Sequence, residues 1–288
     1  MGTVAIRIFP LILMPLVAFA AEDSFQLEGA VNYEATDFDG NTDLTQFGIR
    51  GRYYLDPLSR AFKDFPLAET QFVQRIPSVE GTFGRYDLEV GTGLNIEADG
   101  FGFGAGMEYL RPGQPYTVSA EFLRADLDVS GGAGNADISN YAIGVGRYLD
   151  EVTHVKVSFE RMDLEVQGGG AAQMDQNVFS VSGKHLWRSP AGNYVNLEAE
   201  AQRQDNQGGN NWGLGVLADF YFDQFFSAGA GFEYNFGSDD AVEGMTFSAD
   251  IGVFLRNDIK VDFGIEMHDA DAPNGDYDSL TIDVLKRF

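Results

Sequence analysis

The sequence contains no cysteine, so disulfides and a lipid-modified N-terminal cysteine are both excluded. Basic residues are scarce as well: 19 Lys and Arg stand against 44 Asp and Glu, and the net charge is −25. This charge argues against a nucleic-acid partner, because phosphate backbones are bound by basic surfaces. The sequence also has no glycine-rich phosphate loop, no cluster of zinc ligands and no convincing helical repeat. These absences leave carboxylates as the main carriers of polar chemistry.

The sequence has no apolar run long enough to cross a membrane as a helix, which takes about 20 residues. The run from Ile8 to Val17 contains two prolines, follows Arg7 and ends at Ala18-Phe19-Ala20. A basic start, a short apolar core and a small-x-small site are typical of a secretory signal peptide. We therefore expect residues 1–20 to be a cleaved signal peptide. Its removal, with one base and no acid, changes the net charge from −25 to −26.

The sequence is rich in alternation between apolar residues and polar or small ones. Between residues 212 and 222 the even positions are all apolar, whereas the odd positions include Gly213, Gly215 and Asp219. This period of two predicts strands with two different faces. Such segments continue for about ten residues, the length with which a tilted strand crosses a bilayer, whereas strands of globular proteins have about five or six. The polar face suits a water-filled lumen.

Counting these segments along the chain predicts fourteen strands. They fall near residues 24–36, 44–56, 79–91, 96–110, 115–128, 138–149, 153–166, 176–188, 193–206, 211–222, 224–237, 244–256, 258–269 and 277–288. Short turns alternate with longer, Gly-rich or acidic loops, as in barrels whose turns and loops lie on opposite sides of a membrane. We therefore predict an all-β fold, in which residues 21–288 form a transmembrane antiparallel up-and-down β-barrel.

Two segments do not fit this pattern. Residues 57–78 fall on the side of the short turns but are far too long for a turn, so that twelve or sixteen strands remain open. In the strand expected at residues 153–166, the apolar residues move from odd to even positions after Phe159. This phase change indicates a β-bulge.

Aromatic residues gather toward the ends of the expected strands, which is typical of girdles at the two membrane interfaces. They include Trp187, Tyr194, Trp212, Tyr221, Phe222, Phe225, Phe226, Tyr234 and Phe236. The sequence also ends on an alternating segment, TIDVLKRF, whose last residue is the aromatic Phe288.

The segment GRYYLDPLSRAFKDFPLAETQFVQRIPSVEGTFGRY, the strand hairpins after it and the final KRF resemble the putative general porins of Gram-negative bacteria. In that family a YY-x-D-P…PLAE-x-x-F-x-x-R segment follows the second strand. The likeness covers essentially the whole mature chain and is sharpest over residues 52–76. It implies a barrel in the cell outer membrane, in contact with outer-membrane lipid and lipopolysaccharide, and leaves the number of subunits open.

The resemblance also suggests a role for the C-terminus. Outer-membrane barrels resemble one another in a last strand with alternating hydrophobic residues and a terminal aromatic, which the barrel assembly machinery reads. Leu280, Ile282, Val284 and Phe288 fit that pattern, whereas Lys286 stands where an aromatic is more usual. We therefore expect Phe288 to be an assembly signal.

The polar faces of the expected strands would line the lumen. The residues predicted to line the pore are Glu28, Arg50, Arg52, Glu108, Glu121, Lys156, Glu160, Glu198, Glu200, Asp219, Glu233, Asp250, Lys260, Asp262 and Glu266. Acids outnumber bases in this set, and charges of one sign in a confined path concentrate the opposite ion. We therefore expect a porin for passive diffusion of small hydrophilic solutes and ions that prefers cations, with neither a catalytic site nor a cofactor.

Two alternatives to this function and one additional property remain open. The lumen acids could pair with Arg and Lys and merely fill a non-conducting structural or surface-interaction barrel. A hydrolase at the outer rim is the second, because EMHDAD brings His268 close to Asp269 and Asp271, and a His beside a carboxylate can activate water. His154 is expected in a turn and His185 within a strand. Acidic loop tips could also bind calcium, through Asp37, Asp39, Asp43, Asp239, Asp240, Asp269, Asp271 and Asp276.

Overall fold

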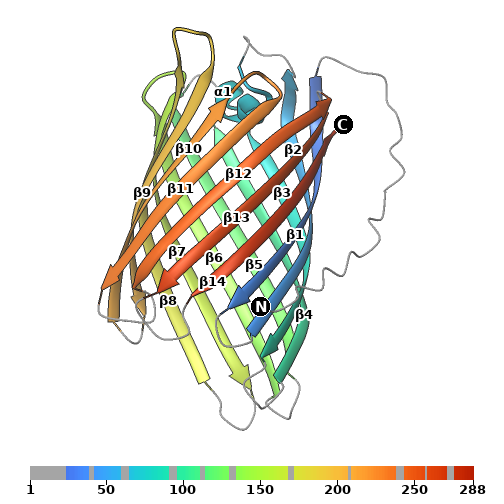
Figure 1. Cartoon of the computed structure of the whole chain (residues 1–288), viewed down its shortest axis with the longest axis vertical. Helices are drawn as coiled ribbons and strands as arrows, with labels where there is room; N and C mark the ends of the chain where they lie inside the picture. Colours follow the sequence, from blue (N-terminus) through green and yellow to red (C-terminus); the bar gives the residue numbers. More distant parts are fainter. Residues whose placement is uncertain are drawn as a thin grey trace.

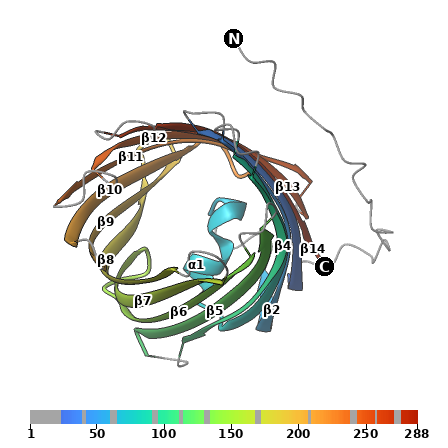
Figure 2. The same cartoon turned by 90° about the horizontal axis from the view of Figure 1, so that it is seen from below.

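Fourteen antiparallel strands close into one barrel in the computed structural model (Figures 1 and 2). The structure describes residues 24–38, 42–59, 65–90, 96–110, 114–129, 134–167, 172–206, 209–237, 243–256, 258–270 and 276–288. The predicted signal peptide, residues 1–20, lies outside them. None of the helices in these ranges is long and apolar enough to cross a membrane.

Each strand pairs with its neighbours in sequence, and β1 pairs with β14. The strands are β1 (Ser24–Phe38), β2 (Thr42–Ser59), β3 (Ser78–Val90), β4 (Ile96–Leu110), β5 (Tyr116–Val129), β6 (Gly134–Tyr148), β7 (Thr153–Gln167), β8 (Ala172–Arg188), β9 (Tyr194–Asn206), β10 (Gly209–Tyr221), β11 (Phe226–Gly237), β12 (Gly244–Arg256), β13 (Ile259–Ala270) and β14 (Tyr277–Arg287). The predicted fourteen-stranded, up-and-down β-barrel is confirmed, and the open alternatives of twelve or sixteen strands are excluded.

The seam between the first and last strands closes the barrel. β1 and β14 pair continuously from Glu28 opposite Arg287 to Phe38 opposite Tyr277. Beyond that ladder the N–H of Phe288 donates to the carbonyl of Leu27 at 2.8 Å. We call the end of the barrel that contains Ser24 and Phe288 the terminal end, and the opposite end the loop end.

An apolar outer wall surrounds the barrel. Ile143, Val145 and Val157 are 62 %, 61 % and 58 % exposed, respectively. Successive strand residues point to opposite faces, and Lys156, which precedes Val157, lines a cavity in the lumen. An exposed apolar surface of this extent is typical of contact with lipid, and the predicted transmembrane character of the barrel is thereby confirmed.

Toward the loop end the two faces of β7 exchange their character. The outward series continues from Phe159 to Arg161 and Asp163, whereas the inward series continues from Glu160 to Met162. β7 pairs with β6 and β8 throughout without a register shift, so the predicted bulge was wrong. The apolar residues change parity because the outer wall becomes charged at this level. Figure 1 shows β5 to β8 reaching farther at this end than β11 to β14.

Exposed arginines mark the level at which the outer wall changes. Each forms an ion pair with an aspartate two residues later on the same strand, and its side chain is 43–49 % exposed. The pairs are Arg85–Asp87 at 3.0 Å, Arg124–Asp126 at 3.2 Å, Arg161–Asp163 at 2.7 Å and Arg203–Asp205 at 2.9 Å. Such exposed pairs add little stability. The repeated F-x-R-x-D at residues 83–87, 122–126 and 159–163 marks the edge of the apolar belt that faces the loop end.

The two ends should lie on opposite sides of the membrane, with the terminal end inside the cell envelope. Because the chain has no cysteine, a single introduced thiol reports its own position. Asn135→Cys, at the exposed start of β6, should react with a membrane-impermeant maleimide on intact cells. Ala191→Cys, in the exposed turn between β8 and β9, should react only after lysis. The reverse pattern would invert the orientation of the barrel.

Phe288 offers a second test. The ring is 41 % exposed on the outer wall, so packing alone gives a modest reason for its presence. If it is an assembly signal, Phe288→Ser should sharply reduce the heat-modifiable folded protein in the outer membrane. Leu255→Ser is the matched control, because Leu255 is 66 % exposed and lies near the same end on β12. Equal losses in both variants would assign the effect to lost lipid contact.

Candidate functional site

A segment of the chain folds into the lumen at the terminal end. It contains a 3₁₀ turn, η1 (Leu67–Glu69), and a short helix, α1 (Thr70–Gln74). Figure 2 shows α1 inside the ring of strands. Arg75 has a φ of 54° and ends the helix in the left-handed conformation, which turns the chain back toward β3. We call residues 65–77 the plug; they account for most of the segment that was too long for a turn.

The plug has an apolar side that packs on the barrel wall. Val73 belongs to a buried cluster with Leu186, Tyr194 and Tyr221. The ring of Phe72 lies 5.5 Å from that of Tyr148 and tilted against it. These contacts correct one prediction: Tyr194 and Tyr221 are 6 % and 5 % exposed and face the plug, not the membrane interface. Trp187 and Trp212, at 50 % and 46 % exposed, do lie on the outer wall.

A buried carboxylate fixes one side of the plug. Glu69, 5 % exposed, accepts a hydrogen bond from the hydroxyl of Tyr221 at 2.6 Å. Its other oxygen lies 2.9 Å from Nζ of Lys184, which also contacts Glu198 at 2.8 Å. A buried charge is tolerated only when it is paired and hydrogen-bonded, and Glu69 meets both conditions.

A second polar network fixes the opposite side. Oε1 of Gln71 accepts from Arg52 at 2.7 Å, while its amide group donates to Glu108 at 3.2 Å. Arg52 in turn pairs with Glu80 at 2.6 Å. Arg287, which pairs with Glu28 at 2.8 Å, donates to the carbonyl of Leu67 at 2.9 Å. Together with the contacts of Glu69, these bonds attach the plug to β2, β4, β8, β10 and β14. The plug therefore spans the terminal end of the lumen.

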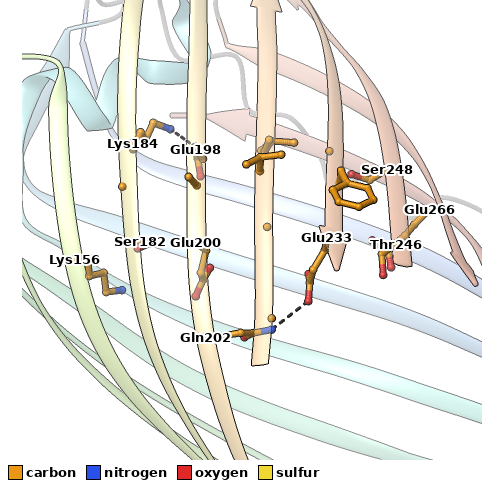
Figure 3. A pocket seen from close by; sticks show the side chains of 18 of the residues that line it. Lys156, Ser182, Lys184, Glu198, Glu200, Gln202, Glu233, Thr246, Ser248 and Glu266 are labelled. Atoms are coloured by element: carbon orange, nitrogen blue, oxygen red, sulfur yellow. Dashed lines mark hydrogen bonds and ion pairs between the residues drawn. The ribbon is translucent and has the colours of Figure 1, made fainter. Parts of the chain in front are cut away.

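Beyond the plug the lumen opens into a cavity of about 390 Å³ on the wall formed by β7 to β13 (Figure 3). Its charged lining is Lys156, Lys184, Glu198, Glu200, Glu233 and Glu266. A smaller cavity of about 190 Å³ lies on the opposite wall and includes Glu80, Glu121 and Glu160. Small residues make room for the larger cavity, because Gly213, Gly215 and Gly231 form part of its floor.

The residues predicted to line the pore divide into two groups. Some take part in ion pairs within the lumen: Glu28, Arg52, Glu198, Lys260 and Asp262. The acids without an ion-pair partner among the described residues are Glu108, Glu121, Glu160, Glu200, Asp219, Glu233, Asp250 and Glu266. Arg50 and Lys156 are the predicted bases that form no ion pair within the same part of the chain. The unpaired charge of the lumen is therefore mainly negative.

Two of these acids converge above one glycine. A Cβ on Gly229 would collide with a carboxylate oxygen of Asp219 and with one of Asp250. Asp219 accepts a hydrogen bond from the amide of Asn196 at 2.9 Å, which leaves its charge uncompensated. Two like charges held this close create a strongly negative point on the lumen wall.

The histidines do not form a catalytic pair. His268 and Asp269 are consecutive in β13 and point to opposite faces, and Nδ1 of His268 contacts the hydroxyl of Thr246 at 2.8 Å. Asp271 lies outside the described residues. His154 was predicted to lie in a turn, but it lies in β7. There it lines the larger cavity and contacts Thr117 at 3.0 Å.

Calcium binding at the loop tips stays a prediction. Asp39, Asp239, Asp240 and Asp271 lie outside the described residues. In the part of the chain that the structure describes, no group of three or more acidic or histidine side chains is arranged to hold a metal ion.

Several residues of the site were not predicted from the sequence. Glu69 lies in the segment whose place was left open, and Glu80 and Arg287 lie on strands whose lumen faces were incompletely assigned. Alternation alone could have placed Glu80 and Arg287 in the lumen. Each is next in sequence to an apolar residue of the outer wall, Val79 or Phe288, and successive strand residues point to opposite faces. No local signal places Glu69, since its partners lie on distant strands.

A model of the family described as putative general bacterial porin matches residues 4–284, nearly the whole chain. The chain is similar to the solved Acinetobacter baumannii outer membrane protein Omp33, with a TM-score of 0.60 and 16 % identity, covering 93 % of this chain and 100 % of that one. A bacterial polysaccharide outer membrane secretin gives a TM-score of 0.54 at 11 % identity, covering 93 % and 100 %.

The P. putida toluene transporter TodX gives a TM-score of 0.51 at 8 % identity, covering 93 % of this chain and 91 % of that one. No curated protein matches the sequence. At identities of 8–16 %, the solved structures support only the fold of the chain. The family model, in contrast, matches the sequence along nearly its whole length.

The plug should limit the flow of ions through the barrel. Replacing residues 66–76 by a flexible Gly-Ser linker of equal length removes its apolar side and both polar networks. We expect a folded, heat-modifiable barrel whose single-channel conductance is several times that of the unaltered protein. A linker of the same composition replacing residues 190–192, a turn at the same end, is the control and should change conductance little. Equal conductance of the plug variant and the unaltered protein would show that the plug does not restrict the pore.

Proposed function

Because the chain belongs to the family of putative general bacterial porins, we propose that its barrel conducts small hydrophilic solutes and ions passively across the outer membrane, with a preference for cations. The observation that carries the preference is the set of lumen carboxylates without a cationic partner. Charges of one sign in a confined, low-dielectric passage raise the local concentration of the opposite ion.

The distribution of bases supports the same preference. Arg52, Lys184, Lys260 and Arg287 are each held by at least one carboxylate within 2.9 Å. Their charge is therefore largely compensated before a solute meets it. The convergent Asp219 and Asp250, by contrast, have no such compensation among the described residues. A permeating ion would thus encounter mainly negative wall.

The size of the permeating solute should be set by the plug. Contacts from β2, β4, β8, β10 and β14 hold it across the terminal end, so only the space beside it remains for passage. We infer that conduction is restricted to small solutes and that the barrel performs no chemistry on them. No residue is assigned a catalytic role.

A second candidate function follows from the same plug. If the packing around Val73 and the bonds of Glu69 and Gln71 seal the terminal end completely, the barrel would be a non-conducting structural element. Single-channel recording of the purified, refolded protein separates the two, since a sealed barrel gives no current.

Charge selectivity tests the proposal directly. A KCl gradient across a planar bilayer should give a reversal potential of cation-selective sign. The selectivity should weaken at molar salt, because the Debye length falls from about 10 Å at 0.1 M to about 3 Å at 1 M. The double substitution Asp219→Asn with Asp250→Asn should reduce the reversal potential at low salt.

The matched control changes the same charge on the outer wall. Asp163→Asn with Asp205→Asn removes two half-buried carboxylates that face away from the lumen, and should leave the reversal potential nearly unchanged. An anion-selective potential in the unaltered protein would mean that Arg50 and Lys156 control the narrowest point. Equal effects of the two double variants would mean that total charge, not the lumen acids, sets selectivity.

A further inference from the structure

In the larger cavity, a row of residues that lie side by side on β7 to β11 has a basic residue at one end and acidic residues at the other. Pairing between strands places Lys156 opposite Ser182, Ser182 opposite Glu200, Glu200 opposite Gly215, and Gly215 opposite Glu233. All five residues line the cavity. Adjacent strands lie about 4.8 Å apart, so Lys156 and Gly215 are separated by roughly 14 Å along the row. The row crosses from a basic edge to an acidic one.

The acidic part of the row surrounds a recess above Gly215. A Cβ at this position would meet nothing nearer than Cγ of Glu233 and the carbonyl of Phe232, both at 4.0 Å. Glu200 and Glu233 flank the recess from the two neighbouring strands. Among the described residues, the hydrogen bonds that Glu233 accepts come from the neutral amides of Gln202 and Asn235, which leave its negative charge uncompensated. A positively charged group fits between these two carboxylates.

The basic end of the row is a lysine without an ion pair to any described residue. The end of the Lys156 side chain lies over Gly144 of β6, beside the hydroxyl of Ser119. Its flexible four-carbon stem allows the ammonium group to turn along the row toward Ser182. Lys184, the other lysine of the cavity, is held by Glu69 and Glu198 and is therefore not available to a solute. Lys156 is the partner that the cavity offers to an anionic group.

Neutral hydrogen-bonding groups occupy the positions between and beside the charges. Figure 3 shows Ser182, Thr246 and Ser248 on the same wall as Glu200 and Glu233. A hydroxyl can both donate and accept, so this wall suits amide and hydroxyl groups of a solute. An extended Lys156 side chain covers about half of the distance between its backbone and the recess. About 7 Å then remains between its ammonium group and the recess, which is the span of two extended residues.

We propose that this cavity binds small zwitterions of dipeptide length, with the ammonium group between Glu200 and Glu233 above Gly215 and the carboxylate at Lys156. The inference rests on the proposed conduction of hydrophilic solutes and names one solute class that the channel favours. A monocation lacks the contact with Lys156, and a monoanion is repelled by the two glutamates. A zwitterion can contact the two glutamates with its ammonium group and Lys156 with its carboxylate.

Three probes of nearly equal size test the proposal. They are diglycine, a zwitterion; glycylglycinamide, a cation; and N-acetyldiglycine, an anion. For each probe, the concentration that halves the open-channel current through the unaltered protein is measured in a planar bilayer at low salt. Diglycine should act at a concentration at least tenfold below the other two.

Substitutions then assign the two ends of the solute. Glu200→Gln with Glu233→Gln should raise the half-blocking concentration of diglycine about tenfold. Lys156→Gln should remove the difference between diglycine and glycylglycinamide while leaving the cation itself unaffected. Glu89→Gln with Glu165→Gln is the matched control, because both residues are exposed on the outer wall; it should change neither value. Heat-modifiable mobility confirms that each variant is folded.

The possible outcomes separate this proposal from the proposed function. Equal half-blocking concentrations for the three probes in a cation-selective channel would overturn the zwitterion site and leave the porin function intact. Glycylglycinamide acting as strongly as diglycine would replace the proposal by a simple cation site. A barrel without current would overturn the porin function; saturation-transfer NMR with the same probes on the refolded protein then decides binding, and absence of a preference for diglycine overturns the site as well.

Discussion

Backbone hydrogen bonding in a medium without water is the constraint on which the rest of this structure depends. An unpaired N–H or C=O in hydrocarbon costs several kcal/mol, so a sheet that crosses a membrane must close. β14 returns to β1 along the whole seam, and the main chain of Phe288 extends the pairing to Leu27. Once the sheet is closed, its period of two separates a lipid-facing wall from a wet interior. The composition follows from that separation: Ile143 and Val145 are exposed outside, and carboxylates are tolerated inside.

The plug changes what the interior can do. A fourteen-stranded barrel is wide enough to leave a water path, but residues 65–77 cross its terminal end. The plug is held by an apolar patch on one side and by bonds of Glu69 and Gln71 to several strands. The lumen charges therefore perform two separate tasks. Carboxylates such as Glu198 compensate bases near the plug, while Asp219, Glu200 and Glu233 retain their charge and shape the field along the passage.

Much of the fold could be predicted because its signals are local. The number of strands was predicted correctly, and most boundaries were right within a few residues. Errors arose where a local pattern had a non-local cause. The parity change after Phe159 resembles a bulge, but it reflects the level at which β7 leaves the apolar belt. Tyr194 and Tyr221 have the position of girdle aromatics along their strands, yet they contact a plug that no spacing predicts.

The sequence by itself determined the barrel, the residues that alternate between its faces, the acidic character of the lumen and the family likeness. Each of these depends on residues one or two positions apart or on composition. Only the tertiary structure decided which lumen charges meet. Arg287 and Glu28 are 259 positions apart, and Glu69 and Tyr221 are 152 apart. Closure of the barrel and entry of the plug bring such pairs together, and neither the period of a strand nor the charge of a segment specifies a partner in a distant part of the chain.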